Sequence, residues 1–133
     1  MRVEKISDAK IRRIMIIENN DDINITFKLV LSESDPRIRI YSFNNSLEAL
    51  QEFKPNFYDL IIIDIMMPKI NGFRFHDIVK RLDSKAKICY LTTMTKDIIK
   101  KAYPEVEKFS LLRIPVTNQE LVKITKELLE LYE

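Results

Sequence analysis

The sequence predicts an α/β domain built on a doubly wound parallel sheet of five strands. Short apolar runs alternate with segments of helical periodicity along the chain, which is the pattern of repeated strand-helix units. The most apolar run, Leu60 to Asp64, needs cover on both faces and therefore predicts a central strand. A chain of 133 residues holds one core, and we expect an N-terminal arm over residues 1–11 and the domain over residues 12–133.

The first strand and the first helix are both marked by their end residues. Arg13 to Glu18 is apolar until its polar end, as expected of a buried strand that stops at the surface. A helix should begin at Asp21, capped by Asn19 or Asn20, because apolar residues then recur at helical spacing. The proline at position 36 should end this helix, since the residue before a proline avoids helical dihedral angles.

The next three elements lead to the centre of the sheet. Arg37 to Phe43 alternates arginine with apolar residues, which is typical of a strand at a sheet edge. Asn45 or Ser46 should cap a short helix that continues to Phe53. Leu60 to Asp64 then supplies the central strand described above.

The second half of the chain repeats the alternation. A helix should follow Gly72, the only glycine, and a fourth strand should cover Lys87 to Leu91. Lys96 to Tyr103 predicts a weak helix that the next proline ends. Leu111 to Arg113 is a short fifth strand, and Asn118 should cap a last amphipathic helix.

Composition excludes several classes of protein. The chain has 22 basic and 20 acidic residues, so it carries no strong field that would indicate a nucleic-acid partner. Apolar runs are too short to span a membrane, and the first residues lack the apolar segment of a secretion signal, so we expect a cytoplasmic protein. The only cysteine, Cys89, should pack in a core strand, and the only histidine, His76, should be solvated on a helix.

Polar residues stand at the carboxyl ends of the predicted strands. Glu18 and Asn19 follow the first strand, Asp64 ends the third, Thr92 follows the fourth, and Pro115 follows the fifth. In an open parallel sheet these ends meet at one edge, where ligands bind. Carboxylates beside a hydroxyl suit a hard cation, or an attack of a carboxylate on phosphorus assisted by that cation.

In these features the sequence resembles the receiver domain of two-component response regulators, from residue 12 to about residue 130. The resemblance rests on "IIENNDD" after the first strand, "DIMMPKING" around Asp64, "LTT" at the end of the fourth strand, and Pro115. It implies a (βα)5 flavodoxin-like fold with strand order 2-1-3-4-5 and a role in phosphorelay signal transduction. Pro115 would then follow a cis peptide bond.

The resemblance also implies a role for each site residue. Asp64 would accept a phosphoryl group from a histidine kinase or a phosphotransfer protein, and Thr92 would be the hydroxyl that senses it. Mg²⁺ would be held by Asp64, Glu18, Asn19 and the backbone carbonyl of Met66. Such a protein is no enzyme beyond its own phosphorylation and dephosphorylation. It would signal to a downstream protein through the face of its fourth helix, fifth strand and fifth helix, with a homodimer as a further possibility.

Two positions depart from the receiver pattern. Asn19 stands where receivers carry a second acid, and Ile114 stands where they carry a lysine. Arg113 is no ready substitute for that lysine, because neighbouring residues on a strand point to opposite faces. Leu111 occupies the place of the usual aromatic residue of the fifth strand.

Two other functions remain open from the sequence. A pseudo-receiver would bind its protein partner without phosphorylation, which the departures at Asn19 and Ile114 favour. A phosphatase of the haloacid dehalogenase type also uses an aspartate at a strand end, but it needs a second aspartate two residues later, where this chain has Met66.

Overall fold

The computed structural model describes residues 10–105 and 110–131, and in this part five parallel strands form one sheet. The strands are β1 (Arg12–Ile17), β2 (Ile38–Phe43), β3 (Leu60–Asp64), β4 (Ile88–Thr92) and β5 (Ser110–Arg113). The helices are α2 (Asp21–Ser34), α3 (Ser46–Glu52), α4 (Gly72–Leu82), α5 (Lys96–Ala102) and α6 (Asn118–Leu129). The strand order is β2-β1-β3-β4-β5, so the predicted fold class and strand order are confirmed.

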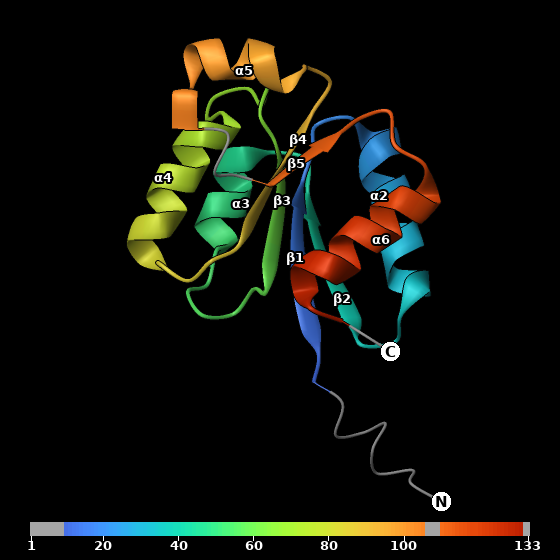
Figure 1. Ribbon diagram of the computed structural model, residues 1–133. Coiled ribbons are helices and arrows are strands. Elements are labelled where there is room, and N and C mark those ends of the chain that lie inside the picture. Colours follow the sequence, from blue (N-terminus) through green and yellow to red (C-terminus); the bar gives the residue numbers. More distant parts are fainter. Residues whose placement is uncertain (1–9, 106–109, 132–133) are drawn as a thin grey trace, which may run out of the picture.

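Helices cover both faces of the sheet, as the apolar central strands require. Helices α2 and α6 lie on one face, and α3, α4 and α5 lie on the other (Figure 1). Strand β2 lies at one edge of the sheet, as predicted, and Arg39 is its one charged residue. No helix in the described part of the chain combines the length and the apolar character needed to cross a membrane.

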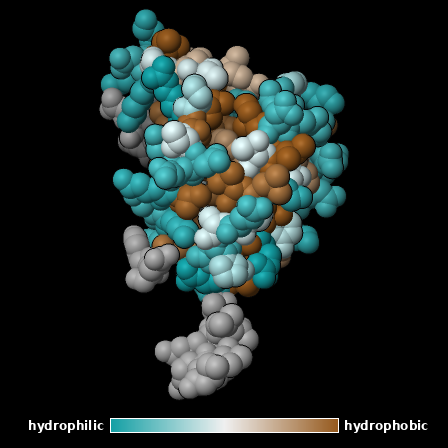
Figure 2. All heavy atoms as spheres, turned by 90° about the vertical axis from the view of Figure 1, so that its right-hand side faces the viewer, coloured by the Kyte–Doolittle hydropathy of each residue, from teal (hydrophilic) through white to brown (hydrophobic). Residues whose placement is uncertain are grey.

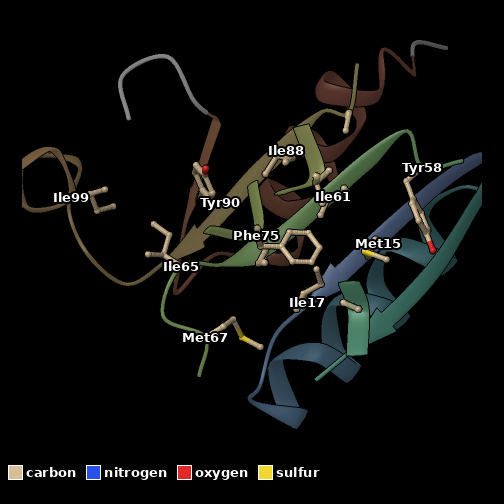
Figure 3. Close-up of a cluster of buried hydrophobic side chains, with 14 residues drawn as sticks. Met15, Ile17, Tyr58, Ile61, Ile65, Met67, Phe75, Ile88, Tyr90 and Ile99 are labelled. Atoms are coloured by element: carbon tan, nitrogen blue, oxygen red, sulfur yellow. The ribbon is translucent and has the colours of Figure 1, made fainter. Parts of the chain in front are cut away.

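Each face of the sheet has its own hydrophobic core. On the side of α3, α4 and α5, fully buried Phe75 lies among apolar side chains of the central strands, including Ile17 and Ile61 (Figure 3). On the side of α2 and α6, Leu31 and Leu121 pack against the alternate residues of the same strands. Cys89 is buried in this second core, where desolvation raises the pKa of its thiol to about 12.

Side chains that accept backbone N–H groups define where the helices begin. Asn20, rather than Asn19, caps α2 by accepting the backbone N–H of Ile23 at 3.0 Å. The prediction that Asn118 caps the last helix is wrong by one residue. Thr117 is the cap, because its hydroxyl accepts the N–H of Glu120 and Asn118 already belongs to the helix.

The prediction for His76 is also wrong, because this side chain is half-buried rather than solvated. Its Nδ1 is hydrogen-bonded to the hydroxyl of Tyr90, a fully buried residue of β4. Desolvation is the main cause that lowers the pKa of His76. The sequence could not show this contact, because it depends on α4 packing across β4.

Asp35 ends α2 and should make stability depend on pH in the acid range. Its buried carboxylate accepts bonds from Arg37 Nε at 2.9 Å and Arg37 Nη2 at 2.6 Å. These bonds lower the pKa of Asp35 from 3.8 to about 2. The stabilisation is therefore present above pH 4 and is lost as the pH falls toward 2. In urea unfolding at pH 7, Asp35→Asn should lower the free energy of unfolding by about 1 kcal/mol, allowing for the partial exposure of Arg37.

A matched variant tests this assignment to Asp35. Asp97 is an exposed acid in the first turn of α5, so Asp97→Asn removes one carboxylate from the surface. It should leave the free energy of unfolding nearly unchanged at pH 7. An Asp35→Asn protein with the stability of the parent chain at pH 7 would refute the prediction.

Candidate functional site

The sheet register brings the predicted acidic residues together. Ile17 of β1 pairs with Ile63 of β3, so the next residues, Glu18 and Asp64, lie side by side at the strand ends. Asp64 pairs with Leu91 of β4, which places Thr92 one residue farther along that strand. Three of the predicted site residues therefore gather at the carboxyl edge of the sheet.

Glu18 is buried at this edge, with 1% of its side chain exposed. Its Oε2 accepts the backbone N–H of Asn20 at 3.2 Å. Desolvation and a hydrogen bond to the side chain of Asp64 raise the pKa of Glu18 from 4.5 to about 7, against the opposing effect of the Asn20 N–H. Burial beside a second carboxylate favours the neutral form of a carboxyl group.

Asp64 is more accessible than Glu18 and is held by its own loop. Its Oδ1 accepts the backbone N–H of Met66 at 2.8 Å. The Asp64 side chain is partly exposed, so a reactant can approach its carboxylate. Gly72, the first residue of α4, packs directly against this turn, since its N–H donates to the Ile65 carbonyl at 3.0 Å.

Thr92 is buried, with 2% of its side chain exposed, and its hydroxyl is held by the following loop. Thr92 Oγ1 accepts the backbone N–H of Met94 at 3.0 Å, so the hydroxyl hydrogen remains available as a donor. The Thr92 carbonyl accepts the N–H of Ile114 at 2.8 Å, which ties the end of β4 to the end of β5. The peptide bond between Ile114 and Pro115 is cis.

The remaining predicted ligand positions lie at the rim. Asn19 is exposed, and 68% of the Met66 side chain is exposed as well. Asp21 and Asp22 lie in the first turn of α2, where their charges favour the helix dipole. Among the described residues, no group of three or more acidic, histidine or cysteine side chains is arranged around a metal position.

Ile114, which stands where receivers carry a lysine, also has apolar surroundings in the fold. The side chain of Ile114 packs at the margin of the core under α2 and α6. Arg113, the last residue of β5, is exposed, whereas Ile114 follows the strand and packs against the core. Within the described part of the chain, no salt bridge joins Glu18 or Asp64 to a basic residue.

Asn24 is a residue of this edge that the sequence interpretation missed. Its buried side-chain amide donates to the Glu18 carbonyl at 2.9 Å and to the Phe43 carbonyl at 2.8 Å. It therefore fixes α2 to the ends of β1 and β2 and helps to position the acidic pair. A signal was available, because Asn24 lies on the same helical face as buried Phe27 and Leu31.

Comparison with known proteins agrees with this geometry. The family model described as "Response regulator receiver domain" matches residues 14–126. The "Probable transcriptional regulator ycf29" of Pyropia yezoensis is 35% identical over 121 residues, which are 88% of this chain and 53% of that protein. The "Transcriptional regulatory protein CpxR homolog" of Haemophilus influenzae is 30% identical over 110 residues, covering 83% of this chain and 48% of its own.

A solved structure shows the same fold. The non-phosphorylated HemR receiver domain from Leptospira biflexa superposes with a TM-score of 0.79 at 20% identity, covering 92% of this chain and 97% of that one. The present chain spans about half the length of the two curated relatives. The family model covers most of the sequence, and the sheet order and strand-end residues agree with it. The chain belongs to the response regulator receiver domain family of two-component signalling.

Proposed function

We propose that Asp64 accepts a phosphoryl group from the phosphohistidine of a histidine kinase or phosphotransfer protein. One observation carries this proposal: an accessible carboxylate, Asp64, lies against a buried one, Glu18, at the edge of a parallel sheet. The Met66 N–H orients one oxygen of Asp64 and leaves the other as the nucleophile. Because phosphoryl transfer depends on positioning and charge neutralisation, this arrangement suits it.

The transfer exchanges one bond to phosphorus for another. The free carboxylate oxygen of Asp64 forms a P–O bond while the P–N bond of the donor phosphohistidine breaks. The electron pair of the P–N bond returns to the imidazole nitrogen of the donor. The product is an acyl phosphate on Asp64, and the neighbouring Thr92 hydroxyl, held through its oxygen by Met94, would donate to a phosphoryl oxygen.

The residues present fit a magnesium ion. Burial and the neighbouring Asp64 carboxylate raise the pKa of Glu18, and a cation between the two carboxylates would relieve their repulsion. Asp64, Glu18, the Asn19 amide oxygen and the Met66 carbonyl would supply the hard oxygen ligands that Mg²⁺ prefers. When bound, the ion would neutralise charge that develops on the transferred group.

Mass spectrometry of the intact protein tests phosphorylation directly. With Mg²⁺ and acetyl phosphate, the chain should gain the mass of one phosphoryl group, and Asp64→Asn should gain none. Asp97→Asn is the matched control, since it removes an exposed carboxylate on α5 and should react like the parent chain. If no phosphoryl group is gained at high donor concentration, the pseudo-receiver takes the place of this proposal.

The acyl phosphate on Asp64 should be lost slowly, over minutes or longer. Met66 is mostly exposed and Met94 packs against the core, and neither thioether can orient an attacking water molecule. Replacing Met66 by asparagine should shorten the half-life severalfold, because a carboxamide binds water. Met66→Leu keeps the volume and should leave the half-life unchanged. Decay of the parent chain within seconds, followed by intact mass, would contradict this prediction.

The phosphatase alternative finds no support at the site. A phosphatase of the haloacid dehalogenase type needs an acid two residues after its nucleophile, and Met66 offers a thioether there.

The output partner of a receiver would meet the face formed by α5, β5 and α6. On that face, Ile98 of α5 exposes 54% of its side chain beside the basic Lys101, which suits a protein contact.

A further inference from the structure

The loop of residues 65–71, which joins β3 to α4, contains a strained turn. Lys69 has a φ angle of 67°, which residues other than glycine seldom adopt. The N–H of Ile70 donates to the Pro68 carbonyl at 2.8 Å, so Lys69 is the middle residue of a γ-turn of the rarer, strained hand. Because strained backbone persists only where its surroundings hold it, other contacts of this loop must stabilise the turn.

The hydroxyl of Ser46 makes one such contact. Ser46 is the first residue of α3 and is 1% exposed, and its Oγ donates to the Pro68 carbonyl at 3.2 Å. The hydroxyl is not needed to cap α3, because the Asn45 side chain accepts the N–H groups of Leu47 and Glu48. It is therefore available to hold the loop that follows the next strand.

Apolar packing gives this hydrogen bond a rigid support. Ala49 of α3 is fully buried, and Met67, the residue before Pro68, is 6% exposed. Both side chains belong to the core that also contains Phe75 (Figure 3). The loop is thus held at two points, by the Met67 side chain in the core and by the Ser46 hydroxyl at the Pro68 carbonyl.

The residues just before the turn belong to the proposed reaction site. The Met66 N–H donates to Asp64 Oδ1 at 2.8 Å, and the Met66 carbonyl is a proposed Mg²⁺ ligand. Only Met67 separates Met66 from Pro68. A shift of the Pro68 carbonyl would therefore move the Met66 peptide group, and a small displacement of reacting groups slows a reaction severalfold or more.

We propose that Ser46 is a positioning residue for phosphoryl transfer, which rests on the function proposed for Asp64. Its hydroxyl holds the γ-turn at Lys69 and thereby fixes the Met66 peptide group that orients Asp64. Ser46 need not touch the phosphoryl group or the metal, because groups that orient a ligand change metal affinity from outside the coordination shell.

The variant Ser46→Ala tests this role with two measurements. Labelling by acetyl phosphate and Mg²⁺, followed by intact mass, should be about fivefold slower than in the parent chain. The dissociation constant of Mg²⁺ should rise about fivefold, measured without a phosphodonor through the backbone amide signals of Met66 and Ile70 in NMR spectra. The side chain loses only its hydroxyl oxygen, so the fold should be retained, which far-UV circular dichroism checks.

Ser34→Ala is the matched control. Ser34 Oγ also donates to a backbone carbonyl, that of Leu31, at 2.7 Å. Ser34 ends α2, which together with α6 forms the face seen in Figure 2, where apolar side chains are exposed among polar ones. Because α3 lies on the other side of the sheet (Figure 1), this variant should react and bind Mg²⁺ like the parent chain. Equal effects of the two serine variants would overturn the proposal, since lost stability alone would then explain both.

Two double variants test whether the γ-turn carries the effect. Ser46→Ala with Lys69→Gly should recover most of the labelling rate and Mg²⁺ affinity, because glycine adopts a positive φ without strain. Ser46→Ala with Lys69→Ala should stay as slow as Ser46→Ala, because the Cβ atom and the strain remain. Both double variants lack the lysine side chain, so equal labelling rates of the two would contradict a role of the turn.

The Mg²⁺ titration separates this inference from the function on which it rests. A parent chain that is not labelled would refute the proposed phosphoacceptor, and the titration would then decide on Ser46. Weaker Mg²⁺ binding by Ser46→Ala would support its hold on the loop, and equal binding would refute it. Labelling of the parent chain and of Ser46→Ala at equal rates would refute the inference about Ser46 alone.

Discussion

Replacing Gly72 by alanine should destabilise the protein by about 2 kcal/mol and slow the phosphorylation of Asp64. A Cβ atom at this position would lie 2.9 Å from the Ile65 Cα and 3.0 Å from the Asp64 carbonyl oxygen. Both atoms belong to the backbone, so no side chain can rotate away. Overpacking of this kind costs up to about 3 kcal/mol, and the better helix propensity of alanine returns at most about 1 kcal/mol.

The same substitution should affect phosphorylation because the clash acts on the residue that reacts. The Gly72 N–H donates to the Ile65 carbonyl, and the turn from Asp64 to Met66 orients the nucleophilic carboxylate. A displacement of this turn by a fraction of an ångström should slow acetyl phosphate labelling about tenfold or more. Urea unfolding and intact mass measure the two effects separately.

Asn118→Ala provides the control for Gly72→Ala. Asn118 is also the first residue of a helix, and its side chain is exposed. This variant should unfold and react nearly as the parent chain does. If Gly72→Ala did the same, close packing of α4 on Asp64 could not be the reason for a glycine at this position.

The backbone arrangement could be predicted from the sequence because it depends on local patterns. The limits of every predicted strand agree with the structure within one residue, since each apolar run ends in polar or turn-forming residues. The strand order followed from the resemblance around Asp64, and it is confirmed. Glu18 and Asp64 could be paired in advance because the carboxyl ends of neighbouring parallel strands meet.

Side-chain contacts between distant elements could not be predicted in this way. Asn24 and His76 both lie on helix faces that the sequence pattern describes only as apolar or polar. Their partners, the Phe43 carbonyl and the Tyr90 hydroxyl, come from strands elsewhere in the chain. The raised pKa of Glu18 likewise depends on the burial of one carboxyl group beside another, which only the folded arrangement determines.

Glu18→Gln should raise the free energy of unfolding by about 2 kcal/mol at pH 8 in the absence of Mg²⁺. The pKa of Glu18 is about 7 in the folded chain, against 4.5 for a solvated glutamate. Between these values the folded state binds a proton that the unfolded state has released, so stability falls as the pH rises from 4.5 to 7. The full shift corresponds to about 3 kcal/mol, and the coupling to Asp64 reduces the share of Glu18.

Two measurements distinguish this electrostatic effect from a general gain in packing: the free energy of unfolding as a function of pH, and its change when Mg²⁺ is added. Urea unfolding should show the two proteins nearly equal below pH 4.5 and increasingly different up to pH 7, because glutamine does not titrate. Mg²⁺ should stabilise the parent chain more than Glu18→Gln, since it replaces the repulsion between Glu18 and Asp64 by attraction. Glu48→Gln, on the exposed first turn of α3, should show neither effect. A constant difference between the parent chain and Glu18→Gln at all pH values would mean that charge at Glu18 does not limit the stability of this site.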